Sequence, residues 1–150
     1  KATAASAADI AVADMFEAFG DKQLKPGQYL WRDVEGDGAT RVVISLSDQL
    51  AFLYEGTTLV AVSTISSGTD THPTPTRIFP ILEKKPMHRS VKYDNAPMPF
   101  MQRIDKYGVA LHAGHLPGHR ASHGCIRLPA KFASKLYKMT NIGTTVLVGA

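Results

Sequence analysis

Three runs of apolar residues in the first half of the chain predict neighbouring β-strands. The runs cover residues 42–46, 50–54 and 59–63, and each is rich in β-branched or aromatic side chains. The stretches between them, 47–49 and 55–57, are short and polar, which suits tight turns between antiparallel strands. We therefore predict a three-stranded antiparallel meander.

The second half of the chain alternates between strand-like and irregular stretches. We predict strands at 77–82, 107–113 and 144–148, and Pro80 favours an edge position for the first of these because proline cannot donate a ladder hydrogen bond. Residues 83–103 carry three prolines and show no clean periodicity. They predict a long loop, which is either a flap over a site or an irregular crossing with a short strand inside it.

Two helices are predicted, one on each side of this β-rich region. A short N-terminal helix is expected to begin with Ser6 as its cap and to end at Gly20. Its apolar stripe consists of Val12, Met15, Phe16 and Phe19. A second helix should start at Pro129, since proline suits the first turn of a helix. Its buried face consists of Phe132, Leu136 and Met139.

Composition favours one globular, mainly β domain. The chain has 150 residues, of which 44% are hydrophobic and 20% charged, and its 12 glycines and 9 prolines favour strands joined by turns. The Ala-rich beginning of the chain ends at a Lys-Pro-Gly break at 25–27. We therefore expect residues 1–27 to form a helical segment and linker, and residues 28–150 to form the main domain.

Charge and hydropathy exclude some classes of partner. The formal net charge is +4, but the lysines and arginines are scattered, and the denser groups fall in a loop and on one face of a helix. This favours a solvated surface over a nucleic-acid site, so no nucleic acid is expected as a partner, although mild basicity also suits an anionic envelope polymer. No window approaches the roughly 20 apolar residues of a membrane span, and we expect no signal peptide within this chain.

Candidate chemistry is concentrated between His112 and Pro129. This stretch holds four of the six histidines and Cys125, the only cysteine, which cannot form an intramolecular disulfide and is an inert thiol, an intermolecular linker or a nucleophile. A histidine at a strand end can meet a cysteine in the Gly-rich loop that follows and exchange a proton with it. Gly124 allows backbone N–H groups around the cysteine to turn toward a substrate carbonyl, as in an oxyanion hole.

The run Ser-His-Gly-Cys-Ile-Arg-Leu at 122–128, preceded by His112, resembles the active-site signature of the L,D-transpeptidase (YkuD-type) catalytic domain. The upstream segment Thr-Pro-Thr-Arg-Ile-Phe at 74–79 is also similar to a segment of that family, and the resemblance covers roughly residues 41–150. It implies an L,D-transpeptidase-like β-sandwich, no metal and no cofactor. It also implies acyl transfer on peptidoglycan stem peptides, with carbapenem-type β-lactams as covalent inhibitors.

The resemblance implies a role for each site residue. Cys125 would attack the carbonyl of the L-centred diamino acid in a tetrapeptide stem, release terminal D-alanine and leave a thioester for an amine acceptor. His112 would be the base, oriented by a backbone carbonyl such as that of Ala113, although His115 or His119 competes for this role. The turn and oxyanion region would consist of Ser122, His123 and Gly124. The candidates for substrate contact are Ser122, Arg127, Met98 and Phe100, of which Arg127 equally suits loop support and the last two suit packing beneath the flap.

Alternatives to transpeptidation are a carboxypeptidase or cross-link hydrolase that uses water as acceptor, and a non-catalytic peptidoglycan-binding module. Zinc is not expected, because Gly114 and Pro117 interrupt the histidine run and no carboxylate lies within it. An Asp-x-Glu-x-Asp-Gly stretch at 33–38 imitates half of a calcium loop and is interpreted as a turn, since Ile44 stands where the final acidic ligand should be. The family resemblance alone implies export to the periplasm or cell envelope.

Overall fold

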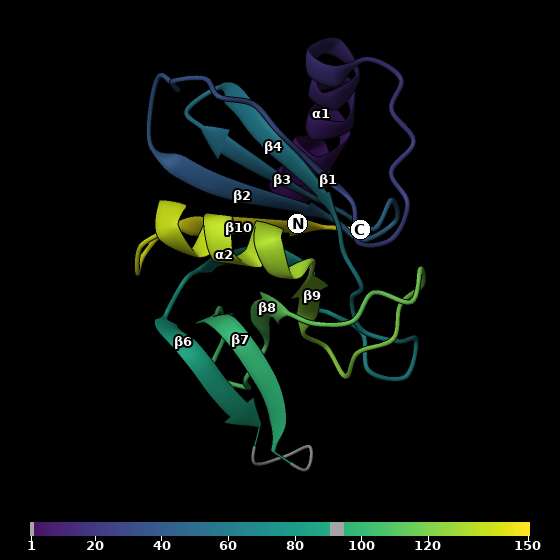
Figure 1. Ribbon diagram of the computed structural model, residues 1–150, viewed down its shortest axis with the longest axis vertical. Helices are drawn as coiled ribbons and strands as arrows, with labels where there is room; N and C mark the ends of the chain where they lie inside the picture. The colour runs from purple at the N-terminus through teal and green to yellow at the C-terminus, as the bar shows by residue number, and fades with distance from the viewer. Residues whose placement is uncertain (1, 91–94) are drawn as a thin grey trace.

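The computed structural model describes residues 2–90 and 95–150, which form two β-sheets and two helices (Figure 1). The first sheet has the strand order β1-β4-β3-β2-β10-β5. Its strands are β1 (Tyr29–Trp31), β2 (Thr40–Ser45), β3 (Leu50–Glu55), β4 (Thr58–Thr64), β5 (Arg77–Pro80) and β10 (Thr145–Gly149). The second sheet, in the order β6-β7-β8-β9, contains β6 (Glu83–Ser90), β7 (Ala96–Arg103), β8 (Ala110–Ala113) and β9 (Ile126–Leu128). The helices are α1 (Ala2–Phe19) and α2 (Ala130–Met139).

The predicted meander and the predicted fold class are confirmed. Strands β2, β3 and β4 pair antiparallel in sequence order, with Val42 opposite Leu53 and Phe52 opposite Val62. Strand β10 pairs parallel with β2 and antiparallel with β5, which leaves β5 at the edge of the sheet as Pro80 predicted. The protein is therefore mainly β, with one helix near each end of the chain.

The main core lies between the two sheets and around α2, which Figure 1 shows passing between them. Phe132 and Leu136 of α2 are fully buried there, as the helical stripe predicted. The rings of Tyr29 and Trp31 pack against Phe132, with centroids 5.8 and 6.0 Å apart. Helix α2 thus joins the layers, and strands β8 and β9 rest on the same core.

Helix α1 is longer than predicted and presents a different face to the sheet. It begins at Ala2 rather than after Ser6, and it ends at Gly20, whose φ of 76° and N–H bond to the Phe16 carbonyl form the expected C-terminal cap. The predicted apolar stripe is wrong in part, because Phe16 is 63% exposed. The buried positions are Ala4, Ala8, Ala11 and Met15. The alanines determine which face of the helix packs on the sheet, because their small side chains allow a close approach that larger side chains would prevent.

The approach of α1 to β10 depends on the absence of a side chain at Gly149. A Cβ built there would lie 2.7 Å from the Ala4 carbonyl oxygen and 3.1 Å from the Ala8 Cβ, which is too close for a backbone neighbour. The helix and strand are therefore in near van der Waals contact, and any added volume at this interface must separate them.

The stretch 83–103 is a hairpin and not the predicted long loop. Strands β6 and β7 pair antiparallel from Glu83 opposite Arg103 to Ser90 opposite Ala96, and the hairpin extends away from the main sheet (Figure 1). Its prolines are accommodated because β6 is an edge strand and β7 has an irregular backbone at Phe100, where φ is 55°. The central part of the predicted flap, residues 91–94, lies outside the described residues.

No helix in the described part of the chain is both long enough and apolar enough to span a bilayer.

Replacing Ala8 by leucine should destabilise the protein, because the added side chain cannot fit between α1 and β10. We expect a loss of about 1–3 kcal/mol in the free energy of unfolding, the usual cost of overpacking a core. Urea denaturation measures it. The matched control is Ala5→Leu on the exposed side of the same helix, where alanine and leucine have similar helix propensities and the change should stay within about 0.5 kcal/mol. Equal effects of the two substitutions would contradict this packing.

Candidate active site

The two short strands β8 and β9 form a parallel pair that separates core residues from cavity residues. Leu111 is opposite Ile126, and both are fully buried in the core between the sheets. His112 is opposite Arg127, one position further on. Because successive side chains of a strand point to opposite faces, His112 and Arg127 point away from that core. Both line a cavity of about 800 Å³.

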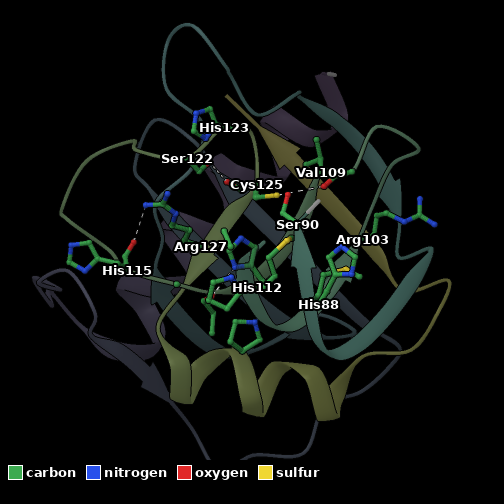
Figure 2. A pocket seen from close by; sticks show the side chains of 18 of the residues that line it. His88, Ser90, Arg103, Val109, His112, His115, Ser122, His123, Cys125 and Arg127 are labelled. Atoms are coloured by element: carbon green, nitrogen blue, oxygen red, sulfur yellow. Dashed lines mark hydrogen bonds between the residues drawn. The ribbon is translucent and has the colours of Figure 1, made fainter. Parts of the chain in front are cut away.

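Cys125 lines the same cavity (Figure 2). It stands two positions before Arg127, so the alternation places its side chain on the cavity face of β9. The thiol is half-buried, and its Sγ lies 3.6 Å from the Gly108 carbonyl oxygen, to which it donates a hydrogen bond. The structure therefore brings the cysteine and the strand-end histidine to one cavity, as the sequence predicted. Among the described hydrogen bonds, the thiol donates to the Gly108 carbonyl and not to the His112 imidazole.

A backbone carbonyl fixes the orientation of the His112 ring. Its Nδ1 lies 2.8 Å from the Ala113 carbonyl oxygen, and the side chain is buried. Because a carbonyl only accepts, Nδ1 carries the proton and Nε2 keeps its lone pair. The predicted hydrogen bond to Ala113 is confirmed, and it leaves His112 in the tautomer that a general base requires.

Burial keeps both groups neutral at pH 7. Burial lowers the pKa of His112, which the hydrogen bond to Ala113 partly offsets, and the charge of Arg127 lowers it further. Burial also raises the pKa of the Cys125 thiol, and the backbone N–H of Ala110 opposes this only in part. The resting site thus holds a neutral thiol and a neutral imidazole in one cavity rather than a preformed thiolate–imidazolium pair.

The turn that carries Cys125 is held by the Ser122 hydroxyl. Its Oγ accepts the Gly124 N–H at 3.1 Å and donates to the Cys125 carbonyl at 2.5 Å. Gly124 has a φ of 124°, a region that side chains disfavour, although a Cβ there would meet no atom closer than 3.9 Å. Glycine is therefore required for its backbone angle. Since its N–H is bound to Ser122, an oxyanion donor from this turn would have to be another amide.

Thr74 is a structural member of the site that the sequence did not single out. Its buried Oγ1 accepts the Gly68 N–H at 2.9 Å and donates to the Gly124 carbonyl at 2.7 Å. It thereby joins the turn that carries Cys125 to the segment after β4. The Thr-Pro run at 74–75 was a usable signal, because it belongs to the part of the sequence that resembles the family.

Arg127 supports the loop between β8 and β9. Its guanidinium donates to the carbonyls of His115 and Ala121, both at 3.4 Å, and so spans most of the loop. It also lines the cavity, so the support it gives does not exclude contact with a substrate.

The other histidines occupy less central positions. His115 lines the cavity, but Figure 2 shows its ring on the rim, turned away from Cys125. His119 is exposed and is not among the cavity-lining residues. His123 is exposed, and its ring packs edge-to-face against His72 with centroids 4.9 Å apart. Among the four described histidines at 112–123, only His112, in strand β8, is buried, and a backbone carbonyl orients its ring.

The hairpin supplies one wall of the cavity. Met98 and Met101 are buried beside Cys125, whereas the Phe100 ring packs against Tyr137 at 5.8 Å and is not among the lining residues. The positive φ of Phe100 interrupts the alternation of side chains along β7. For this reason Met98 and Met101, which are three residues apart, both face the cavity. The lining residues that sequence reasoning missed include His88, Arg103 and Tyr107. His88 and Arg103 were missed because the hairpin was predicted as a loop, and Tyr107 because its turn was predicted as the start of a strand.

No group of three or more histidine, cysteine, aspartate or glutamate side chains among the described residues is arranged to hold a metal ion.

Comparison with known proteins identifies the family. The family model described as YkuD, the L,D-transpeptidase catalytic domain, matches residues 39–148. The chain belongs to the YkuD family. The match covers strands β2 to β9 and all but the last residue of β10, and it extends over the whole β8–β9 loop and α2. No curated protein matches the sequence.

Solved structures share the YkuD fold. An L,D-transpeptidase from Stackebrandtia nassauensis is 23% identical with a TM-score of 0.71, and the match covers 91% of this chain and 65% of that one. An L,D-transpeptidase in complex with imipenem, LdtMt1, is 20% identical with a TM-score of 0.68 and coverage of 73% and 58%. A cysteine-to-serine mutant of the Enterococcus faecium L,D-transpeptidase is 27% identical with a TM-score of 0.66 and coverage of 73% and 49%. The chain thus spans between half and two thirds of these neighbours.

The neutral resting state of this YkuD site predicts slow alkylation of Cys125 by iodoacetamide at pH 7. Because burial raises the thiol pKa, the rate should rise with pH through a midpoint above the usual thiol value of about 8.5. The measurement is the alkylation rate by mass spectrometry between pH 6 and 10, with glutathione as the reference thiol. A midpoint below that of glutathione would contradict the neutral pair.

Proposed function

We propose that this chain is a cysteine acyltransferase, an L,D-transpeptidase that acts on peptidoglycan stem peptides. The observation that carries the proposal is the arrangement of Cys125 and His112 on one face of the β8–β9 pair, open to a cavity of about 800 Å³. A cavity of this size suits a peptide segment. Membership of the YkuD family supports the reaction and the substrate class.

The first half-reaction forms a thioester. The Cys125 thiol turns from the Gly108 carbonyl toward His112, whose Nε2 takes the Sγ proton as the sulfur attacks the carbonyl of the L-centred diamino acid in a tetrapeptide stem. The tetrahedral intermediate then loses the amine of terminal D-alanine. That amine leaves with the proton held by His112, and the acyl group stays on Cys125.

The second half-reaction releases the enzyme. The amine of an acceptor stem loses a proton to His112 Nε2 and attacks the thioester carbonyl, and the thiolate leaves and regains the proton. The product is a new amide cross-link. With water as acceptor the same steps give a carboxypeptidase or hydrolase. Peptidoglycan lies outside the cytoplasm, and we propose that the chain works there.

The remaining residues of the site shape it. Ser122 and Gly124 hold the turn before the nucleophile, and His123 flanks that turn at the surface. Arg127 keeps the loop in place and presents its charge to the cavity. Met98 forms an apolar floor beside Cys125. We propose that the stem peptide lies between this floor and the loop.

Imipenem should acylate the protein once, on Cys125, since a neighbour of this fold was solved in complex with that β-lactam. Intact-protein and peptide mass spectrometry should show one adduct in the wild type and none in Cys125→Ser. His112→Gln should slow acylation by about 10²–10⁴-fold because the general base is lost, whereas His119→Gln, outside the cavity, should leave the rate unchanged. An unmodified wild type would indicate a binding module, and an adduct on a residue other than 125 in the serine variant would exclude Cys125 as the nucleophile.

Purified disaccharide-tetrapeptide should be converted into cross-linked dimer with release of one D-alanine per bond formed. Chromatography with mass spectrometry measures both products, and Cys125→Ala is the control that should give neither. Trimmed monomer without dimer would assign the hydrolytic reaction instead.

A further inference from the structure

The turn between β2 and β3 contains a residue in an unfavourable backbone conformation. Gln49 has a φ of 53°, in the left-handed region that residues other than glycine and asparagine rarely adopt. This conformation persists only where surrounding contacts enforce it. The contacts of Gln49 therefore indicate what the strained turn holds in place.

The amide of Gln49 holds one residue of the segment after β4 from both sides. Its Oε1 accepts the N–H of Ser67 at 3.1 Å, and its Nε2 donates to the Ser67 Oγ at 2.7 Å. The Nε2 also donates to the Leu46 carbonyl at 2.9 Å, which anchors the side chain to its own turn. The Gln49 carbonyl accepts the Ile65 N–H at 3.1 Å. Ser67 itself is buried, so both packing and the hydrogen bonds to Gln49 hold it in place.

Ser67 in turn anchors the residues that precede Cys125 in the loop. Its carbonyl oxygen accepts two consecutive amides, the N–H of Ala121 at 3.0 Å and the N–H of Ser122 at 3.1 Å. Ser122 then binds Gly124 and the Cys125 carbonyl through its hydroxyl. A continuous path of hydrogen bonds thus leads from the first sheet to the reactive sulfur's backbone.

A second contact joins the same turn to the loop before the nucleophile. The guanidinium of Arg120 donates to the Leu46 carbonyl at 3.0 Å, the same oxygen that receives the Gln49 amide. The strained turn therefore contacts both the segment after β4 and the loop that leads into Ser122.

We propose that Gln49 is a positioning residue for the reaction, which acts through Ser67 and Ser122 to set the place of Cys125 relative to His112. This inference rests on the proposed function for its catalytic consequence. Its structural consequence, the ordering of residues 119–126, can be measured independently.

The test compares Gln49→Ala with Gln49→Gly and with Gln23→Ala, an exposed glutamine of the linker. Alanine keeps a Cβ at the strained backbone angle and removes the amide with its Cγ methylene, whereas glycine also relieves the angle. We expect both substitutions at Gln49 to slow imipenem acylation by about 10–100-fold, because small displacements of a reacting group cost rates of this order. Gln23→Ala should react at the wild-type rate.

Two readouts separate positioning from general stability. Hydrogen exchange of a peptide covering residues 119–126 should become at least tenfold faster in Gln49→Ala, while peptides of α1 stay protected. With the peptide substrate, kcat should fall and KM should stay within twofold. Ser67→Ala should give a similar defect, and the double variant should be no worse than the single ones, since both lie on one path.

The proposal and the proposed function fail in different ways. Acylation and exchange of Gln49→Ala within twofold of the wild type would overturn the positioning role, as would full activity of Gln49→Gly, which would reduce Gln49 to an ordinary turn residue. Additive effects of Gln49→Ala and Ser67→Ala would also overturn it. A wild-type protein that does not react with imipenem would overturn the proposed function, and the exchange of residues 119–126 would then decide the role of Gln49 alone.

Discussion

The parallel pairing of β8 with β9 decides which side chains meet in this protein. Leu111 and Ile126 are buried in the core. Because side chains alternate along a strand, the next residues, His112 and Arg127, must point to the opposite face. A slip of one residue in either strand would send Cys125 or His112 into the core. The free energy that drives folding therefore also places Cys125 and His112 on one face, and the polar contacts of Ser122 and Thr74 then hold the turn that carries the sulfur.

The same burial determines how the pair handles protons. An apolar wall formed by Met98 and Met101 covers one side of the sulfur, and desolvation favours the uncharged thiol and the uncharged ring. Under the proposed mechanism, charge appears only when the thiol proton moves to the ring. An exposed thiolate would be open to oxidation in an oxidising compartment, and a neutral, half-buried thiol is less so.

Local pattern was enough to predict the elements that are stabilised by their own periodicity. These include the meander, the edge strand with Pro80 and the helix that buries Phe132. The sequence pattern failed where strand pairing or close packing between elements determines the structure. The hairpin β6–β7 has an exposed first strand and a backbone irregularity at Phe100, so no alternation marks it. Helix α1 buries alanines because Gly149 lies beneath them, a fact of tertiary packing. Within the site, the motif identified Cys125, but the supports of its turn come from distant segments.

The position of β10 in the first sheet affects how the chain reaches this structure. The strand lies between β2 and β5 and aligns Thr145 with Arg41, so the sheet is completed by a segment that is about 100 residues from its partner β2 in the sequence. Bringing together segments so far apart in the sequence costs chain entropy before their contacts form, so the folding barrier is largely entropic. Until then the meander has one open side, and helix α1 has only part of its docking surface. Docking of β10 should consequently be a late step of folding, because it joins β2, β5 and helix α1 at once.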